Sequence, residues 1–373
     1  MTRRALLALV LLWCAACGGG GAGGGDDRRA ADDGERAPAG DPARDLELDL
    51  RWTWAAPSTG MPASDGREVA IVSTRSKITL LDGGGAVRWE LEGRSLRDVA
   101  PTLTPDLVLV PTEDGLLAVD RAGGRRRWEA AVGERVNTPA VVGTRAVATT
   151  WEGTLVAFEL ADGRIAWRTP LGGASLGPAV AAGSGTAVAT FDSGRAAGAV
   201  ATDVATGRPR WTVPLPANGV SGPAVEGDTV VLVAGDISAH GLALADGSTR
   251  WRQRLQGSGS PEVPPLPRGD GTVLVGHRQG GVALLDARDG AVRWDASAPD
   301  SAAVRGGPVG PGPNGWFALP LDDGQVLMAG PDREPDVRDP PGFVPGVAAG
   351  PGGVLLIART QGDDNGLDAV SGW

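Results

Sequence analysis

Short apolar runs separated by glycine- and proline-containing turns recur along the chain from Arg51 to its end. Leu107–Val110, Ala146–Thr149, Val230–Val233 and Val273–Val275 are examples of these runs. Runs of this length that are bounded by turn residues are typical of buried β-strands. The pattern therefore predicts an all-β body built from short strands.

Four strand signals follow one another in the same order in each repeat. The first comes after Gly-Pro or Thr-Pro, as at Gly222-Pro223, and the second is one of the buried runs. A tight turn such as Asp114-Gly115 precedes the third strand, of which Leu155–Phe158 is an example. The fourth strand carries a tryptophan. Four short strands in a repeat of about 40 residues predict the blade of a β-propeller.

A tryptophan on the fourth strand sets the register of the repeat. Six copies have a glycine four residues before the tryptophan: Gly85 and Trp89, Gly124 and Trp128, Gly163 and Trp167, Gly207 and Trp211, Gly247 and Trp251, and Gly290 and Trp294. In four copies an acid stands eight residues before it, at Asp120, Glu159, Asp203 and Asp286. Glycine suits the positive φ of a tight hairpin turn. We interpret the tryptophans as residues that pack between blades; stacking on a ligand is the alternative.

The two ends of the repeat region complete each other. The seventh copy is degenerate and has Val337 in the tryptophan position, and the last copy ends at Trp373 before a fourth strand. The segment Arg51–Pro57 has a fourth-strand signal without the three strands before it. Trp54 has a proline three residues later, as Trp167 and Trp211 do, so we expect Trp54 to hold the tryptophan position of this strand. The sequence predicts an eight-bladed β-propeller of four-stranded blades, in which the N-terminal strand closes the last blade and no sheet edge is exposed at the seam.

The N-terminus has the features of an export signal. Arg3 and Arg4 precede the apolar run Ala5–Trp13, which is too short for a transmembrane helix of about 20 residues. Cys14-Ala15-Ala16-Cys17 then resembles the bacterial lipobox, although Cys14 stands where that pattern usually has Leu. The resemblance implies that Cys17 is lipidated. An ordinary secretory signal and twin-arginine export are the alternatives.

Three parts of the chain follow from these patterns. Residues 1–16 are predicted to be a lipoprotein signal peptide, and residues 17–50 the lipidated cysteine and a flexible tether. The tether is rich in Gly, Asp and Arg and has no apolar periodicity, so it cannot form a core. Residues 51–373 form the predicted propeller.

Composition and charge narrow the possible functions. The net charge of −10 argues against nucleic acid as a partner. Both cysteines lie in the first 17 residues, so the body has no disulfide framework. His240 and His277 are the only histidines and lie in different repeats, so we expect no metal site. Asp363-Asp364-Asn365-Gly366 is interpreted as a turn, with a Ca²⁺ loop as the alternative.

The D-x-x-x-G-x-x-x-W hairpin at this spacing resembles the PQQ-like β-propeller repeat, over residues 51–373. Together with the lipobox, the eight predicted blades resemble the BamB-type outer-membrane assembly lipoproteins. This resemblance implies a monomeric, non-enzymatic scaffold without a cofactor, anchored by lipid to the cell envelope. It would bind envelope or membrane proteins, at the periplasmic face of an outer membrane or at the cell surface.

Two other functions remain open. The same repeat builds quinone (PQQ)-dependent dehydrogenases, which typically use a vicinal cysteine pair and a Ca²⁺ ion. The body of this chain contains no cysteine, which argues against such an enzyme. A ligand-binding sensor lipoprotein is the further alternative.

Overall fold

The arrangement of the chain comes from a computed structural model. It describes residues 48–55, 60–73, 76–175, 177–178, 180–182, 185–216, 218–256, 263–277, 281–297, 304, 309–331, 334–340, 343–360 and 365–373. Contacts divide the chain into the units Met1–Asp45 and Leu46–Trp373, and every described residue belongs to the second unit. The predicted signal peptide and Cys17 therefore lie outside the described residues.

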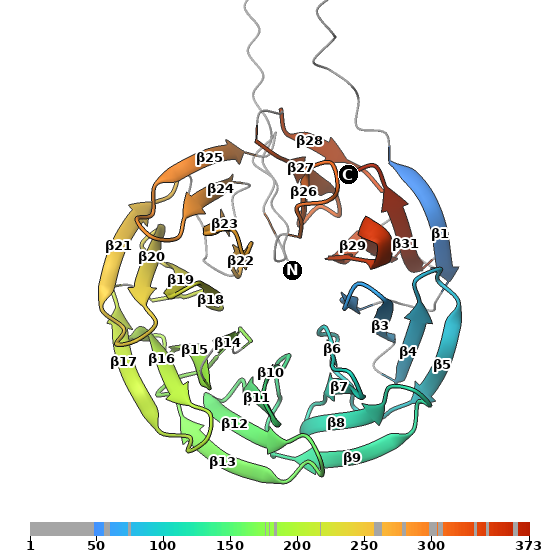
Figure 1. The fold of residues 1–373 in the computed structure, drawn as a ribbon, viewed down its shortest axis with the longest axis horizontal. Coiled ribbons are helices and arrows are strands. Elements are labelled where there is room, and N and C mark those ends of the chain that lie inside the picture. Colours follow the sequence, from blue (N-terminus) through green and yellow to red (C-terminus); the bar gives the residue numbers. More distant parts are fainter. Residues whose placement is uncertain are drawn as a thin grey trace, which may run out of the picture. The chain divides into compact units, whose positions relative to one another are not determined.

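The described strands form eight antiparallel sheets, seven with four strands and one with three. Figure 1 shows them around a ring, with the first strand of a blade toward the centre and the fourth at the rim. The unit is an all-β, eight-bladed propeller, as the sequence predicts.

Blades 1 to 6 follow one another along the chain. Blade 1 contains β2 (Ala63–Ser64), β3 (Glu68–Ser73), β4 (Lys77–Asp82) and β5 (Val87–Glu92), and blade 2 contains β6 (Thr102–Leu103), β7 (Leu107–Pro111), β8 (Gly115–Asp120) and β9 (Arg126–Ala131). Blade 3 contains β10 (Ala140–Val142), β11 (Arg145–Thr149), β12 (Thr154–Glu159) and β13 (Ile165–Pro170), and blade 4 contains β14 (Val180–Ala182), β15 (Thr186–Asp192), β16 (Ala197–Asp203) and β17 (Pro209–Leu215). Blade 5 contains β18 (Ala224–Glu226), β19 (Thr229–Ala234), β20 (Ser238–Ala243) and β21 (Thr249–Arg254), and blade 6 contains β22 (Leu266–Pro267), β23 (Thr272–His277), β24 (Gly281–Asp286) and β25 (Val292–Ser297).

The last two blades complete the ring. Blade 7 contains β26 (Phe317–Pro320), β27 (Val326–Ala329) and β28 (Asp336–Arg338). Blade 8 contains β29 (Phe343–Ala349), β30 (Leu355–Thr360), β31 (Gly366–Ser371) and β1 (Asp49–Ala55), and a 3₁₀ turn, η2 (Pro351–Gly353), precedes β30. The described residues contain no helix that is long and apolar enough to cross a membrane.

The middle strands form the core because each blade packs between two neighbours. All residues of β3, β19 and β24 are buried, whereas β5 and β25 alternate between exposed and half-buried positions. Strands buried on both faces read as continuous apolar runs. The core clusters accordingly combine neighbouring blades: Leu109 of blade 2 lies in one cluster with Phe158 of blade 3.

Both ends of the unit meet in blade 8. As predicted, β1 forms its outer strand by pairing antiparallel with β31, and Figure 1 shows the two side by side. Thr53 Oγ1 donates to Asp368 Oδ1 at 2.8 Å, and Arg51 Nε donates to Ser371 Oγ at 2.6 Å. The ring therefore cannot open at this seam without breaking a strand ladder.

The C-terminal tryptophan secures the same region. Trp373 is only 1% exposed and lies in one core cluster with Trp316 and Met328 of blade 7. Its Nε1 donates to the carbonyl of Gly353 at 2.8 Å, and its own carbonyl accepts from the backbone N–H of Asn314 at 2.9 Å. The last residue thus joins blades 7 and 8.

Blade 7 differs from the other blades because three of its strands are described, whereas each of the others has four. Its outer strand β28 places Val337 opposite Leu327, in the predicted position. Within the described residues, the position of the first strand holds an isolated bridge between Val309 and Ala318. Pro311 and Pro313 follow that bridge, and because proline has no N–H they cannot extend a ladder of hydrogen bonds.

Six tryptophans each pack onto a turn glycine of the following blade. Each indole Nε1 donates to a carbonyl of that turn: Trp52 to Gly83 at 3.2 Å, Trp89 to Arg121 at 2.7 Å, Trp128 to Leu160 at 2.8 Å, Trp167 to Val204 at 2.8 Å, Trp211 to Leu244 at 2.9 Å and Trp251 to Ala287 at 2.9 Å. The facing glycines are Gly85, Gly124, Gly163, Gly207, Gly247 and Gly290. We call each tryptophan–glycine contact a socket.

Glycine is required in the socket for two reasons. The six glycines have φ between 67° and 82°, a region that L side chains rarely adopt. A Cβ on any of them would also lie only 2.5–2.8 Å from the indole of the preceding blade. The residue that makes the hairpin turn therefore also makes room for the neighbouring blade.

The first socket corrects one prediction. Trp52, and not Trp54, contacts Gly85: a Cβ on this glycine would lie 2.6 Å from the Trp52 ring. Trp54 lies two residues further along β1, opposite Leu367, and packs at the edge of the blade 8 core. Neither tryptophan has a glycine four residues before it, so the motif could not distinguish them, and the proline after Trp54 pointed to the wrong one.

The seventh socket is also different. No glycine stands four residues before Val337. Trp294 stacks on Phe317 of blade 7, with ring centroids 6.3 Å apart. An aromatic contact therefore joins blades 6 and 7.

The acid eight residues before the tryptophan ties the hairpin together. Asp203 Oδ1 accepts from the backbone N–H of Thr206 at 2.9 Å, and Oδ2 accepts from Arg210 at 2.7 Å. Asp120 and Asp286 make the same two kinds of contact. The hydrogen bond from Arg210 is the largest cause that lowers the pKa of Asp203, to about 2.

Replacing Gly163 by Ala is expected to destabilise the propeller more than replacing Gly143 by Ala. Both glycines lie in turns of blade 3 with positive φ, so both variants carry left-handed strain of about 1–2 kcal/mol. A Cβ on Gly163 also lies 2.5 Å from Trp128, whereas one on Gly143 meets nothing within 4 Å. Displacing the indole adds about 1–3 kcal/mol. Urea unfolding of the two variants measures the difference, and equal losses would contradict the socket.

Asp203→Asn is expected to lower the melting temperature at neutral pH, with the difference from wild type vanishing in acid. Because the folded-state pKa of Asp203 is lowered from 3.8 to about 2, its contribution is present above about pH 4 and lost as the pH falls toward about 2. Thermal unfolding across this range measures the effect. Asp106→Asn is the control, since Asp106 is exposed and the described contacts give it no ion pair. A difference that persists unchanged at about pH 2 would refute the assignment.

Candidate functional site

The blades present two opposite faces to solvent. In an antiparallel blade, the connections from the preceding blade and the turns between second and third strands lie at one end of the sheet. We call this end the connection face; residues 93–101, 132–139 and 150–153 lie on it. The turns between first and second, and between third and fourth, strands lie at the other end, which we call the hairpin face. Among the described residues, each face carries a polar network that joins neighbouring blades.

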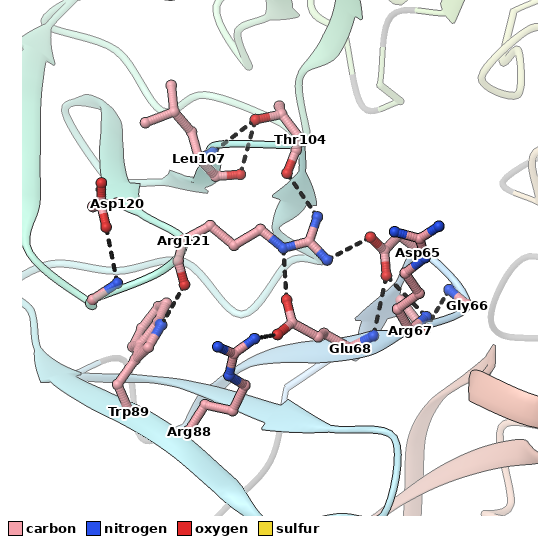
Figure 2. Close-up of polar contacts among 12 residues, drawn as sticks. Asp65, Gly66, Arg67, Glu68, Arg88, Trp89, Thr104, Leu107, Asp120 and Arg121 are labelled. Atoms are coloured by element: carbon pink, nitrogen blue, oxygen red, sulfur yellow. Dashed lines mark hydrogen bonds and ion pairs between the residues drawn. The ribbon is translucent and has the colours of Figure 1, made fainter.

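On the hairpin face, Arg121 joins blades 1 and 2 (Figure 2). Its Nε donates to Glu68 Oε2 at 2.6 Å, and its Nη1 donates to the carbonyl of Thr104 at 2.7 Å. The third guanidinium nitrogen pairs with Asp65, and Arg88 pairs with the second oxygen of Glu68. Figure 2 shows both carboxylates reaching from blade 1 toward this one guanidinium.

Internal partners satisfy the charges of this network. Glu68 is only 6% exposed and has an arginine on each oxygen. Burial is the largest single influence on Asp65 and raises its pKa, but the hydrogen bonds from Arg121 and from the backbone of Arg67, together with the charge of Arg121, outweigh it, so that the pKa is lowered overall. Removing one partner of such a buried pair leaves an uncompensated charge. We interpret the Arg121 network as a fastener between blades.

On the connection face, Asn137 is the centre of a second network. It is only 5% exposed. Its Nδ2 donates to Thr149 Oγ1 and to the carbonyl of Ser175, both at 2.9 Å. Its Oδ1 accepts from Arg97 Nη1 and from Trp151 Nε1, both at 3.1 Å. One carboxamide therefore fixes a guanidinium from the connection between blades 1 and 2 and an indole from the β11–β12 turn of blade 3.

Two arginines lie over the indole that Asn137 orients. The Cζ of Arg135 is 4.0 Å from the ring centroid of Trp151, and that of Arg97 is 5.1 Å from it. Both distances are within the range of a cation–π contact. Arg97 is 7% exposed, whereas Arg135 and Trp151 are half-buried. We call Arg97, Arg135, Asn137 and Trp151 the Trp151 platform. It offers an oriented aromatic ring and guanidinium N–H donors to a partner.

The histidines and the Asp363–Gly366 segment, for which the sequence leads us to expect no metal site, are placed as follows. His240 is buried with its Nε2 3.3 Å from Asp236 Oδ1, and Asp236 pairs with Arg252 at 2.6 Å. The side chain of His277 lies outside the part that is described, as do Cys17, Asp363 and Asp364. Within the described part of the chain, no three His, Cys, Asp or Glu residues are placed to hold a metal ion.

The sequence did not predict the Arg121 network or the network around Asn137. Arg121, Glu68, Arg97 and Asn137 belong to no repeated motif, and their partners lie in neighbouring blades. The one available signal was Trp151, a tryptophan outside the register of the repeat.

Comparison with known proteins agrees with this architecture. Residues 49–175, 92–199 and 152–308 match the model of a family described as outer membrane protein assembly factor BamB. No curated protein matches the sequence.

Solved structures match across most of the chain. BamB from Moraxella catarrhalis is 14% identical with a TM-score of 0.66, and the match covers 87% of this chain and 100% of that one. The C-terminal WD40 domain of Sif2 is 13% identical with a TM-score of 0.70, covering 87% and 98%. A europium-containing methanol dehydrogenase is 13% identical with a TM-score of 0.68, covering 87% and 93%. At these identities the structures show a shared fold. The family matches span residues 49–308, well over half of the chain, so the chain belongs to the family described as outer membrane protein assembly factor BamB.

Proposed function

We propose that this protein is a lipid-anchored, extracytoplasmic β-propeller that acts as a non-enzymatic, protein-binding scaffold in the cell envelope. Membership in a family described as an assembly factor for outer membrane proteins carries this proposal. An assembly factor works by contact with other proteins, and a rigid ring of blades offers two broad faces for such contacts.

The N-terminal sequence supports the anchor. The apolar run Ala5–Trp13 and the following Cys14-Ala15-Ala16-Cys17 fit a lipoprotein signal, in which Cys17 carries the lipid. About 30 residues separate Cys17 from β1, and a flexible chain of this length spans roughly 30 Å. Since β1 is the outer strand of blade 8, the tether joins the propeller at its rim.

A quinone-dependent enzyme is the principal rival. The likeness to a europium-containing methanol dehydrogenase favours the shared fold, at 13% identity. A small-ligand sensor is the other rival. Within the described part of the chain, the group that resembles a built site is the Trp151 platform, which consists of two arginines, an amide and an indole. Such groups suit protein contacts, in which Arg and Trp are often the residues that contribute most.

Cys17→Ala is expected to release the protein from the membrane fraction while it is still exported. The full-length chain is expressed in bacterial cells, and these cells are grown with a clickable fatty acid. The wild type should sediment with membranes and carry the label, because the acyl chains on Cys17 would insert into the bilayer. Cys14→Ala is the matched control and should behave as wild type. Unlabelled wild type, or a Cys17→Ala variant that keeps the label, would refute the anchor.

In-cell crosslinking tests the scaffold role. Crosslinked wild type is expected to recover defined envelope proteins, identified by mass spectrometry. The purified protein, supplied with PQQ and Ca²⁺ or a lanthanide, is expected to leave alcohols and sugars unoxidised. Turnover under these conditions would overturn the scaffold in favour of the enzyme. A tightly bound small ligand without any protein partner would favour the sensor.

A further inference from the structure

The repeat serves as an internal control for the Trp151 platform. An isolated bridge joins each of several blade connections to the following turn: Leu96 to Thr112, Val136 to Thr150, Ala174 to Asp192, and Val220 to Ala234. These bridges align the same positions in blades 2 to 5. Residues that occupy one position in different blades can then be compared without a second sequence.

Blade 3 is the exception at two of these positions. In the blade connection, the position just before the bridged residue holds a different residue in each blade. From blade 2 to blade 5, these residues are Ser95, Arg135, Gly173 and Gly219. In the turn between the second and third strands, the position just after the bridged residue holds Glu113, Trp151, Ser193 and Gly235 in blades 2 to 5, respectively. Three of the four blades thus form with small or acidic residues where blade 3 has an arginine and a tryptophan. The fold does not require these two large side chains, so their contact calls for another explanation.

The platform is oriented before any partner arrives. Asn137 fixes the indole nitrogen of Trp151, and the buried Arg97 donates both to Asn137 and to the carbonyl of Val136, the latter at 2.6 Å. Arg135 lies over the ring, and the described part of the chain gives its guanidinium no hydrogen bond or ion pair. A stacked arginine keeps the N–H donors at its edge available. Little conformational freedom remains to be lost on binding at this site.

A carboxylate is the partner group that fits these donors. A guanidinium binds a carboxylate through two parallel hydrogen bonds, the strongest such pairing in proteins. The nearby Glu134 does not fill this role, because its oxygens accept from the hydroxyls of Thr150 and Thr154. Glu152 is exposed beside Trp151, and the protein has a net charge of −10. These charges repel a strongly acidic segment, so a single carboxylate is favoured over an acidic run.

We propose that the Trp151 platform binds a segment of a partner protein through one Asp or Glu side chain, which Arg135 holds beside the indole of Trp151. This inference rests on the proposed scaffold function and specifies where and by what chemistry the scaffold binds. Arginine and tryptophan supply a large share of the residues that dominate protein interfaces. The connection face of blades 2 and 3 is therefore a docking surface.

Photocrosslinking in cells tests the platform. A photoreactive amino acid replaces Glu152 in the full-length protein, and the crosslinked partner segment is sequenced by mass spectrometry. Arg135→Ser and Trp151→Ser introduce the residue that another blade uses at the same position, so both variants should keep the fold, which thermal unfolding of each purified variant checks. Each is expected to lower the yield of the wild-type crosslink about tenfold or more, and Arg135→Lys should also lower it because lysine lacks the planar fork.

Arg195→Ser is the matched control. Arg195 is an exposed arginine in the corresponding turn of blade 4, and its loss should leave the yield unchanged. In the partner, Asn or Gln in place of the contacting Asp or Glu should reproduce the loss. Folded Arg135→Ser and Trp151→Ser variants with full yield, or a captured segment without a carboxylate at the contact, would overturn the platform and leave the scaffold intact. Failure of general crosslinking to recover any protein with the wild type would instead overturn the scaffold function and the platform with it.

Discussion

Burial of both faces of every blade is the constraint on which the rest of the structure depends. A single blade with all-buried strands such as β3 or β19 would expose two apolar faces. Stacking blades side by side covers these faces, but an open stack leaves one uncovered at each end. Closing the ring removes both ends at once. This explains why the first and last described strands meet in blade 8, where β1 pairs with β31, and why Trp373 is buried against blade 7.

The sockets make that closure specific. Stacked apolar faces alone would tolerate sliding of one blade against the next, because the hydrophobic effect has no direction. The indole N–H of each motif tryptophan donates to a carbonyl in the next blade, which fixes the distance and angle between them. A buried tryptophan also removes about 150–250 Å² from water. Local turn geometry and packing between blades therefore depend on the same glycine.

Periodicity made most of the fold predictable from the sequence. The eight blades, the composite last blade and the position of Val337 follow from signals that recur, and the structure has them. The assignment of Trp54 failed because β1 lacks the glycine that marks the motif. In blade 7, the described residues hold only an isolated bridge at the first-strand position, beside Pro311 and Pro313. The Arg121 network and the Asn137 centre were unpredictable for another reason. Their partners are brought together across blades by the ring, and no spacing along the chain records that distance.

Function in such a ring arises where one copy differs from the others. The sockets and the Asp–Arg hairpin contacts repeat and serve the fold. The Arg121 network satisfies its own charges and fastens blades 1 and 2. The Trp151 platform breaks the repeat on the connection face with a pair of large side chains that the other aligned blades do without.

Native-state hydrogen exchange of Trp211→Ala tests most directly whether closure makes the ring one cooperative unit. Trp211 forms the socket between blades 4 and 5, and its loss should cost about 3–5 kcal/mol. If every blade depends on its neighbours around a closed ring, the slowest-exchanging amides of all eight blades should lose the same free energy of protection. Loss of protection confined to blades 4 and 5, with the opposite blades unchanged, would contradict the account.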